Sequence, residues 1–381
     1  MRVTGFGFEV LATDPDTGAR RGRLATPHGT VESPVFIPCG TQATVKTLSP
    51  RDLEEEGVEL ILCNTYHLSL RPGAETIAAL GGLHRFMAWP RALLTDSGGY
   101  QVFSMAELRR ITEEGVHFRS HLDGSSHTLT PEGAIAIQEG LGADIVMAFD
   151  DCTPYPATPD QARASLELTL RWAERCLAAR TRADQALFGI VQGSVFPDLR
   201  AEAADRLTAL PFDGYAIGGL SVGESKGQML GVLRHTAPRL PAERPRYLMG
   251  IGTPEDLLLG IAAGIDMFDC VMPTRHGRTG SLFTRQGRLS IKAAEYARDA
   301  RPVDPECACY TCRTFSRAYL RHLFVADETL GLRLNTLHNV HFYLTLMAEA
   351  RQALVEGTFA KFLDDRLTAF QGSPDGSAAA E

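Results

Sequence analysis

Short apolar runs recur along the chain, and each one ends in a polar or glycine-rich turn. Eight of them are separated by spacers long enough to form a helix, a pattern typical of strands buried on both faces of a parallel sheet. We predict these strands at residues 36–39, 60–64, 93–96, 146–150, 188–192, 215–219, 247–250 and 267–270. Eight such units predict an α/β fold, a closed TIM (β/α)8 barrel, whose chemistry lies at the carboxyl ends of its strands.

The pattern changes outside these units. Residues 1–34 predict an N-terminal β-hairpin packed on the barrel, with its turn at residues 14–18. Short strands predicted at 111–118 and 121–124 place a β-excursion after the third barrel strand. Helices are predicted over 160–180 and 198–210, strand character over 280–294 and mainly helices over 319–370.

These segments suggest how the chain is divided. We expect a barrel catalytic domain over residues 35–371, which includes an inserted C-terminal subdomain at about 280–345. Residues 372–381 carry too few apolar side chains to pack and are expected to form a disordered tail.

Composition and charge narrow the class of protein. The 381 residues exceed the roughly 250 of a bare barrel, which leaves room for these additions. The formal charge of −8 argues weakly against a nucleic-acid binder, but it is compatible with a local basic patch. The N-terminus lacks the apolar core of a signal peptide, and nowhere do about 18 uninterrupted apolar residues occur. We therefore expect a cytoplasmic protein, whose eight cysteines are thiols or metal ligands rather than disulfides.

Three of the cysteines, Cys307, Cys309 and Cys312, fall within six residues. Unmetallated thiols on a loop are the simpler interpretation, but three cysteines at this spacing favour a metal site. With one histidine they would form a closed tetrahedral set for a structural Zn²⁺, which leaves no open position for water. The spacing leaves the fourth ligand open among His322, His338 and His341.

Polar side chains follow several of the predicted strands. Asp96 could serve as a helix N-cap, and Gln192 could satisfy loop backbone groups, so neither is decisive alone. Burying Asp150 beside Asp151 without partners is costly, so a bound ligand or cation is expected there. Asp269 is the strongest candidate for a functional residue, because it lies on an otherwise apolar strand and is followed by an arginine-containing segment.

The surroundings of these side chains suggest a class of ligand. The glycine pair Gly98-Gly99 lets the backbone approach a ligand closely. Asp266, three residues before Asp269, is expected on the opposite side of the strand, in a structural role. A carboxylate can accept paired N–H donors or attack a sugar C1, so the set predicts a barrel enzyme acting on a polar heterocycle or a sugar.

Longer segments carry a resemblance to one family. They are TDSGGYQVFS from Thr95, MAFDDCTPYP from Met147, GIVQGS from Gly189, IGGLSVGE from Ile217, YLMGIGTPED from Tyr247 and GIDMFDCVMPTRHGRTG from Gly264. With the cysteine set they closely resemble the bacterial tRNA-guanine transglycosylases, also called queuine tRNA-ribosyltransferases, in the same order along nearly the whole chain. The resemblance implies a TIM barrel with an inserted zinc subdomain, His338 as the fourth zinc ligand, and a homodimer.

The resemblance also implies an activity: exchange of the guanine at wobble position 34 of tRNAs with a GUN anticodon for the 7-deazaguanine preQ1, a step in queuosine biosynthesis. Asp269 matches the nucleophile that forms a covalent ribosyl-aspartate, and Asp96 matches the proton donor and acceptor. The positions that match the family's base-binding residues are Asp96, Ser97, Gly98, Gly99, Tyr100, Asp150, Gln192, Gly219, Leu220 and Met249. Those that match its RNA-contacting residues are Gly250, Ile251, Gly252, Thr253, Pro254, Glu255, Asp256, Thr274, Arg275, His276, Gly277 and Arg278.

Details of the same segments bear on the substrate. Cys152 and Val222 match the bacterial pocket, whereas eukaryotic relatives differ there and leave space for the larger base queuine, so preQ1 is favoured. Asp151 stands where the family has Glu, which leaves the detail of base selection less defined. Two other classes are weighed: a catalytically silent tRNA-binding subunit, which Asp96 and Asp269 argue against, and a barrel nucleosidase acting on free nucleosides.

Overall fold

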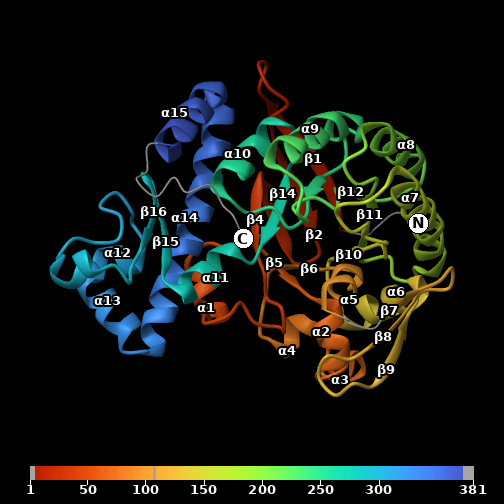
Figure 1. The fold of residues 1–381 in the computed structure, drawn as a ribbon, viewed down its shortest axis with the longest axis horizontal. Coiled ribbons are helices and arrows are strands. Elements are labelled where there is room, and N and C mark those ends of the chain that lie inside the picture. The colour runs from red at the N-terminus through yellow and green to blue at the C-terminus, as the bar shows by residue number, and fades with distance from the viewer. Residues whose placement is uncertain (1–4, 106–108, 372–381) are drawn as a thin grey trace.

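The computed structural model describes residues 5–105 and 109–371, and its centre is a parallel eight-stranded sheet (Figure 1). The strands are β4 (Val35–Pro38), β5 (Leu60–Cys63), β6 (Ala92–Thr95), β10 (Ile145–Met147), β11 (Ala186–Val191), β12 (Gly214–Ile217), β13 (Arg246–Leu248) and β14 (Met267–Cys270). They pair in the order β4-β14-β13-β12-β11-β10-β6-β5, and a parallel bridge between Cys39 and Leu62 joins the two ends. All eight predicted strands and the barrel are therefore confirmed.

Burial on both faces explains why the strands are continuous apolar runs. Along each strand, successive side chains point alternately into the barrel and out toward the helices. Ile37, Leu94 and Met147 belong to the cluster inside the barrel. Phe36, Leu93 and Val146 belong to the second cluster, between the sheet and the helices. Because both faces of the strands are covered, polar side chains are favoured near the strand ends rather than along the strands.

Helices connect the strands around the outside of the barrel (Figure 1). Pro at the first turn and a capping Ser or Thr start several of them; Thr158, for example, forms a capping box with Gln161. The two helices predicted at 160–180 and 198–210 are confirmed as α7 and α8. The full set is α1 (Pro50–Glu55), α2 (Thr65–Leu70), α3 (Ala74–Ala79), α4 (Gly82–Phe86), α5 (Gly99–Met105), α6 (Pro131–Leu141), α7 (Pro159–Ala179), α8 (Pro197–Thr208), α9 (Lys226–Thr236), η1 (Ala237–Arg239), α10 (Pro254–Ala262) and α11 (Met272–Thr279).

The predicted N-terminal hairpin is present and has one more strand. β1 (Gly7–Thr13) and β2 (Arg20–Thr26) form the hairpin, and β3 (Gly29–Ser33) extends it to a three-stranded antiparallel sheet. The sheet is tied to the barrel by Arg20, whose guanidinium forms a buried ion pair with Asp266 at 2.5 Å. Asp266 also accepts a hydrogen bond from the backbone N–H of Arg246, so the structural role predicted for it is confirmed.

The β-excursion after the third barrel strand is confirmed, with one local error. It consists of β7 (Arg109–Ile111), β8 (Val116–Arg119) and β9 (Ser126–Leu129), paired antiparallel. The prediction of strand at 121–124 is wrong, because these residues form the turn between β8 and β9. The Asp123 carboxylate accepts hydrogen bonds from the backbone and hydroxyl of Ser125, a local pattern that competes with strand pairing.

The C-terminal part lies beside the barrel, on the side away from the β-excursion in Figure 1. The predicted strand character at 280–294 and the helices over 319–370 are confirmed. The elements are β15 (Ser281–Thr284), β16 (Gly287–Ser290), η2 (Ala294–Arg298), α12 (Tyr310–Thr314), α13 (Arg317–Val325), α14 (Thr329–Glu356) and α15 (Phe359–Gln371). The expected tail at 372–381 lies outside the described residues. Within 5–105 and 109–371, no helix combines the length and apolar character needed to cross a membrane.

Candidate active site and metal centre

The polar residues predicted at strand ends gather at one end of the barrel. Asp96 follows β6, Asp150 lies just beyond β10, and Gln192 follows β11. Asp269 is the third residue of β14. Because the carboxyl ends of parallel strands share one rim, these side chains face a common space. Gln192 donates a hydrogen bond of 2.7 Å to Asp150, and the charge of Asp269 contributes to the raised pKa of Asp96.

Asp96 is held by three donors. Its carboxylate accepts hydrogen bonds from the Asn64 side chain, from the Thr65 backbone N–H at 2.9 Å and from Gln101 at 2.7 Å. Burial nevertheless raises the pKa of Asp96 from 3.8 to about 6. A carboxyl that titrates near neutral pH is suited to give and to take back a proton. Neither Asn64 nor Gln101 was singled out from the sequence, although both lie in or beside the segments that were.

The two oxygens of Asp269 have different environments. Oδ1 accepts a hydrogen bond from the Tyr247 hydroxyl at 2.5 Å and from the Gly250 backbone N–H at 2.9 Å. Among the residues that the structure describes, Oδ2 has one side-chain hydrogen-bond partner, the Cys39 thiol at 3.5 Å. Burial raises the pKa of Asp269, and the donors on Oδ1 and Oδ2 oppose that rise. The carboxylate is thus fixed in orientation while one oxygen stays available, an arrangement suited to a nucleophile.

Asp150 and Gln192 form a polar face across from Gly219. Burial raises the pKa of Asp150 from 3.8 to about 6, and the nearby Asp151 adds to the rise. The buried Oε1 of Gln192 has no hydrogen-bond partner among the described residues, so it is free to accept one from a ligand. Gly219 has φ of +63°, and a Cβ there would lie 2.3 Å from this Oε1. Only glycine leaves the amide in place.

The other base-binding candidates line the same rim or support it. Ser97 donates to Asp150 at 3.4 Å, and Gly98 adopts φ of +83°. A Cβ on Gly99 would lie 2.9 Å from the Asp150 carbonyl oxygen, so this position is tightly packed. The ring of Tyr100 is 49% exposed. Leu220 is buried and Met249 half-buried, so both supply apolar surface.

The two predicted RNA-contacting stretches both pack on α14. The Tyr343 hydroxyl donates to the Gly252 carbonyl at 2.5 Å, and Asn339 donates to the Pro273 carbonyl at 3.0 Å. A Cβ on Gly277 would lie 2.7 Å from the Thr336 Cα, so α11 and α14 are in close backbone contact. Helix α14 therefore fixes where both stretches lie.

The individual members of these stretches differ in exposure. Arg275 is exposed, and Arg278 is half-buried with a buried Nη1 that has no partner in the described part of the chain. Burial lowers the pKa of Arg278, and the neighbouring Arg275 adds to this. Gly250, Thr253, Glu255 and His276 are also at least partly exposed. The buried members are Ile251, Gly252, Pro254, Asp256, Thr274 and Gly277.

The cysteine cluster forms a four-ligand set. Cys307, Cys309, Cys312 and His338 place their ligand atoms within 4.8 Å of one another. The distances from the three sulfurs to His338 Nδ1 are 3.7, 3.5 and 3.3 Å. A tetrahedral zinc ion with Zn–S of ~2.3 Å and Zn–N of ~2.05 Å requires about 3.6 Å between these atoms. His338 Nε2 lies 2.7 Å from the Phe283 carbonyl, which directs Nδ1 toward the sulfurs. The donor set therefore fits zinc.

Of the three candidate histidines, His338 belongs to the cluster that could hold an ion. His341 pairs with Glu56 at 2.6 Å and also hydrogen-bonds to Cys307, so it lies beside the cluster. His322, on α13, is exposed and is not part of the cluster. His338 is also on α14, the helix on which the two predicted RNA-contacting stretches pack, so the cysteine–histidine set and these stretches share one support.

The fold and this rim define a class of protein: a TIM-barrel enzyme with the carboxylates of Asp96 and Asp269 on one rim, joined to a Cys3His set that could hold a metal ion. A family model described as Queuine tRNA-ribosyltransferase matches residues 14–372. The chain belongs to the queuine tRNA-ribosyltransferase family, as the resemblance in its motifs implies.

Individual relatives agree over nearly their full length. A queuine tRNA-ribosyltransferase of Moorella thermoacetica is 58% identical over 358 residues, which cover 94% of this chain and 96% of the relative. One of Herpetosiphon aurantiacus is 58% identical over 367 residues, 96% of this chain and 94% of the relative. One of Syntrophobacter fumaroxidans is 59% identical over 355 residues, 93% and 95% respectively.

Proposed function

We propose that the protein is a tRNA-guanine transglycosylase, which exchanges guanine 34 of tRNAs with a GUN anticodon for preQ1 through a covalent ribosyl-aspartate. Family membership supports the activity. The observation that carries the mechanism is Asp269, a half-buried carboxylate with Oδ1 held by two donors and Oδ2 3.5 Å from the Cys39 thiol, on the same rim as Asp96.

In the first step, Oδ2 of Asp269 attacks C1′ of the ribose from the face opposite guanine. A bond forms between Oδ2 and C1′, and the bond from C1′ to guanine N9 breaks with its electron pair going to the base. Protonated Asp96 gives its proton to the departing guanine, which its pKa of about 6 allows near neutral pH.

In the second step, preQ1 occupies the same pocket. Asp96, now a carboxylate, takes the proton from N9 of preQ1 as that nitrogen attacks C1′ and displaces Asp269. Each displacement inverts C1′, so two of them retain the configuration of the nucleoside. The phosphodiester chain takes no part in either step.

The base is recognised by the polar face at Asp150. Guanine and preQ1 both present N1–H and an exocyclic N2–H₂ side by side, which a carboxylate accepts as a pair. Gln192 positions Asp150 through the hydrogen bond of 2.7 Å. The unpartnered Oε1 of Gln192 and the backbone of Gly219 supply further acceptors and donors. Buried Cys152 supports preQ1 rather than a larger base.

RNA binds over the loop before α10 and along α11. The exposed Arg275 and the partly buried Arg278 are suited to phosphates near the target nucleotide. Guanine 34 lies in an anticodon loop, so it is turned out of its stack more easily than a paired base. A basic patch of this kind reconciles RNA binding with the overall charge of −8.

One structural zinc ion per chain is held by Cys307, Cys309, Cys312 and His338. It stabilises the C-terminal subdomain and takes no part in the reaction. We also propose a homodimer, supported by apolar surface at Tyr310 and Tyr319, which are 51% and 38% exposed. We propose that the enzyme acts in the cytoplasm, where its tRNA substrates are.

The test is to incubate the protein with unmodified tRNA and preQ1, and to identify the nucleoside at position 34 by mass spectrometry. We expect preQ1 at that position with wild type and none with Asp269→Asn. Unmodified guanine together with retained tRNA binding would indicate a silent subunit instead. Hydrolysis of free guanosine without tRNA would indicate a nucleosidase.

A further inference from the structure

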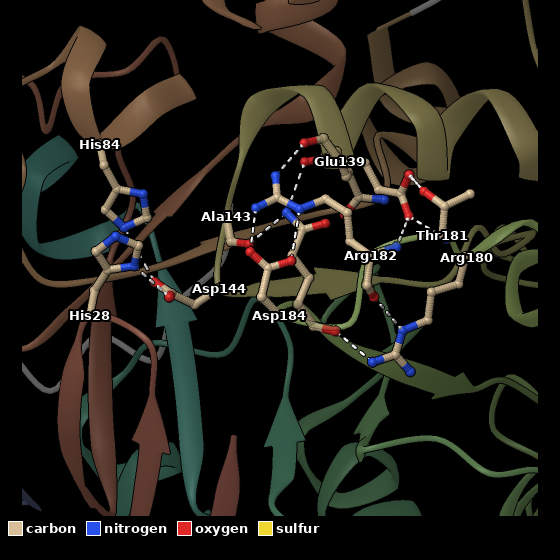
Figure 2. Close-up of polar contacts among 11 residues, drawn as sticks. His28, His84, Glu139, Ala143, Asp144, Arg180, Thr181, Arg182 and Asp184 are labelled. Carbon is tan, nitrogen blue, oxygen red and sulfur yellow. Dashed lines mark hydrogen bonds and ion pairs between the residues drawn. The ribbon is translucent and has the colours of Figure 1, made fainter. Parts of the chain in front are cut away.

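A second cluster of metal-binding side chains lies away from both sites described above. It consists of His28, in the turn between β2 and β3, His84 on α4, and Asp144, just before β10. Asp144 stands at the amino end of its strand, so the cluster is at the end of the barrel opposite the candidate active site. Figure 2 shows the two imidazole rings lying over one another, with Asp144 at their edge.

The three ligand atoms converge. His28 Nδ1 lies 2.7 Å from one oxygen of Asp144, and His84 Nε2 lies 3.2 Å from the other. The two rings are stacked with centroids 3.6 Å apart and planes 16° from parallel. An imidazole nitrogen binds a metal in the plane of its ring, so His28, whose side chain is 40% exposed, must rotate out of this stack for both nitrogens to reach one ion. The backbone carbonyl of Arg91 is 3.1 Å from the same Nε2 and adds an oxygen on that side.

We propose that His28, His84 and Asp144 form a second metal site, which binds a divalent transition-metal ion through nitrogen and oxygen ligands. Ions such as Co²⁺, Ni²⁺ and Zn²⁺ accept imidazole and carboxylate together. With bonds of ~2.1 Å, neighbouring ligand atoms around such an ion lie about 3.0–3.4 Å apart, close to the separations of 2.7 and 3.2 Å. The ion would take the place of the N–H hydrogens now directed at Asp144, and each neutral ring would carry its proton on its other nitrogen.

The carboxylate is rigid and short of cationic partners. Asp144 is almost fully buried, and one oxygen accepts the backbone N–H of Leu93 at 2.8 Å. The arginines on that flank are engaged elsewhere: Arg182 pairs with Asp184 at 2.6 Å, and Arg180 with Asp213 at 2.9 Å. Figure 2 shows Arg182 directed at Asp184. Within 5–105 and 109–371, only the two histidine side chains pair with the Asp144 carboxylate.

The site differs from the cysteine cluster in two ways that matter for detection. It contains no thiolate, so a bound ion would show no sulfur-to-metal charge transfer. It is also open to solvent, because the side chain of His28 is 40% exposed, which provides an entry path and room for bound water. A bound ion would join the N-terminal sheet, α4 and the start of β10, which are far apart in the sequence.

The test uses full-length zinc-loaded protein without a polyhistidine tag, titrated with Co²⁺. We expect one Co²⁺ per chain beyond the zinc, with weak d–d absorption and no sulfur charge-transfer band, and a Co²⁺-dependent rise in the unfolding temperature. His28→Ala should weaken Co²⁺ binding at least tenfold and remove the rise. His28 is suited to this because it lies on a turn and, among the described residues, its side chain hydrogen-bonds to Asp144 and stacks on His84, both within the proposed site. His84→Gln should act in the same way.

The matched control is His117→Ala. His117 is an exposed histidine on β8, and its ring bonds to Thr128. This variant should bind Co²⁺ like wild type. The proposal is overturned if Co²⁺ binds only with the sulfur charge-transfer band, if no Co²⁺ binds beyond the zinc, or if His28→Ala binds it unchanged. Equal unfolding temperatures of wild type and His28→Ala without Co²⁺ would show that the variant is folded. Base exchange should be unaffected, since the cluster lies at the opposite end of the barrel.

Discussion

Asp150→Asn should weaken base binding and stabilise the fold at the same time. Asparagine keeps both existing contacts, because its oxygen can accept from Gln192 and its amide can donate to Ser97. It removes the charge and presents an N–H where the base needs an acceptor. The loss of a charged acceptor costs about 1.5–3 kcal/mol, which corresponds to a roughly 10- to 150-fold rise in KM for guanine or preQ1.

The gain in stability follows from the raised pKa. A carboxyl with a pKa of about 6 in the folded state, against 3.8 unfolded, stabilises the fold below pH 3.8 and loses that contribution as the pH rises through 6. At 1.36 kcal/mol per pH unit, the charged group costs the fold about 3 kcal/mol at pH 8. Asp150 is partly exposed, so solvent screening reduces this to about 1–3 kcal/mol, which the asparagine recovers.

Two measurements check both effects. Urea unfolding should show a larger gain for Asp150→Asn at pH 8 than at pH 5, and steady-state exchange should show the higher KM. A variant that is less stable than wild type at pH 8 would refute the argument from the buried charge. An unchanged KM for guanine would refute the role of Asp150 in base recognition, whatever the stability.

Further predictions concern the nucleophile and the metal. Asp269→Asn should abolish the tRNA adduct that survives denaturation, as seen by gel electrophoresis; an undiminished adduct would move the nucleophile elsewhere. Tyr247→Phe removes the donor at 2.5 Å, so the pKa of Asp269 rises further and the acidic limb of adduct formation should move to higher pH. Tyr215→Phe, whose hydroxyl bonds to the Leu210 carbonyl instead, should leave that limb in place. Cys309→Ser should lower the folded yield and the zinc content measured by atomic absorption; a stable, folded, metal-free variant would be the contrary result.

The barrel was predictable because each strand is buried on both faces and reads as an apolar run. The polar residues at strand ends followed from the same pattern, since parallel strands share one rim. The contacts that tune them could not be predicted in this way. Tyr247 reaches Asp269 only because β13 and β14 are neighbours, and Tyr247 reads as an ordinary member of an apolar run.

Tertiary contacts also explain the other features that could not be predicted from the sequence. His28 and Asp144 are 116 residues apart, so no local spacing pattern in the sequence indicates the cluster that they form with His84. The turn at 121–124 resembles a strand in composition, but hydrogen bonds between Asp123 and Ser125 form a tight turn instead. Which histidine joins the cysteine cluster depends on which face of α14 meets the cysteines, and the spacing alone leaves this open.

Helix α14 joins the proposed zinc site to the surface proposed for RNA. It supplies His338 to the cysteines and, within two turns, contacts both proposed RNA-contacting stretches through Thr336, Asn339 and Tyr343. Without the ion, the chain would therefore keep Asp96 and Asp269 in place on a rigid barrel. It would lose the support that positions the anticodon loop over these two residues. Removing the ion with a chelator should therefore lower the affinity for tRNA first. The rate of base exchange on the tRNA that still binds should fall only later.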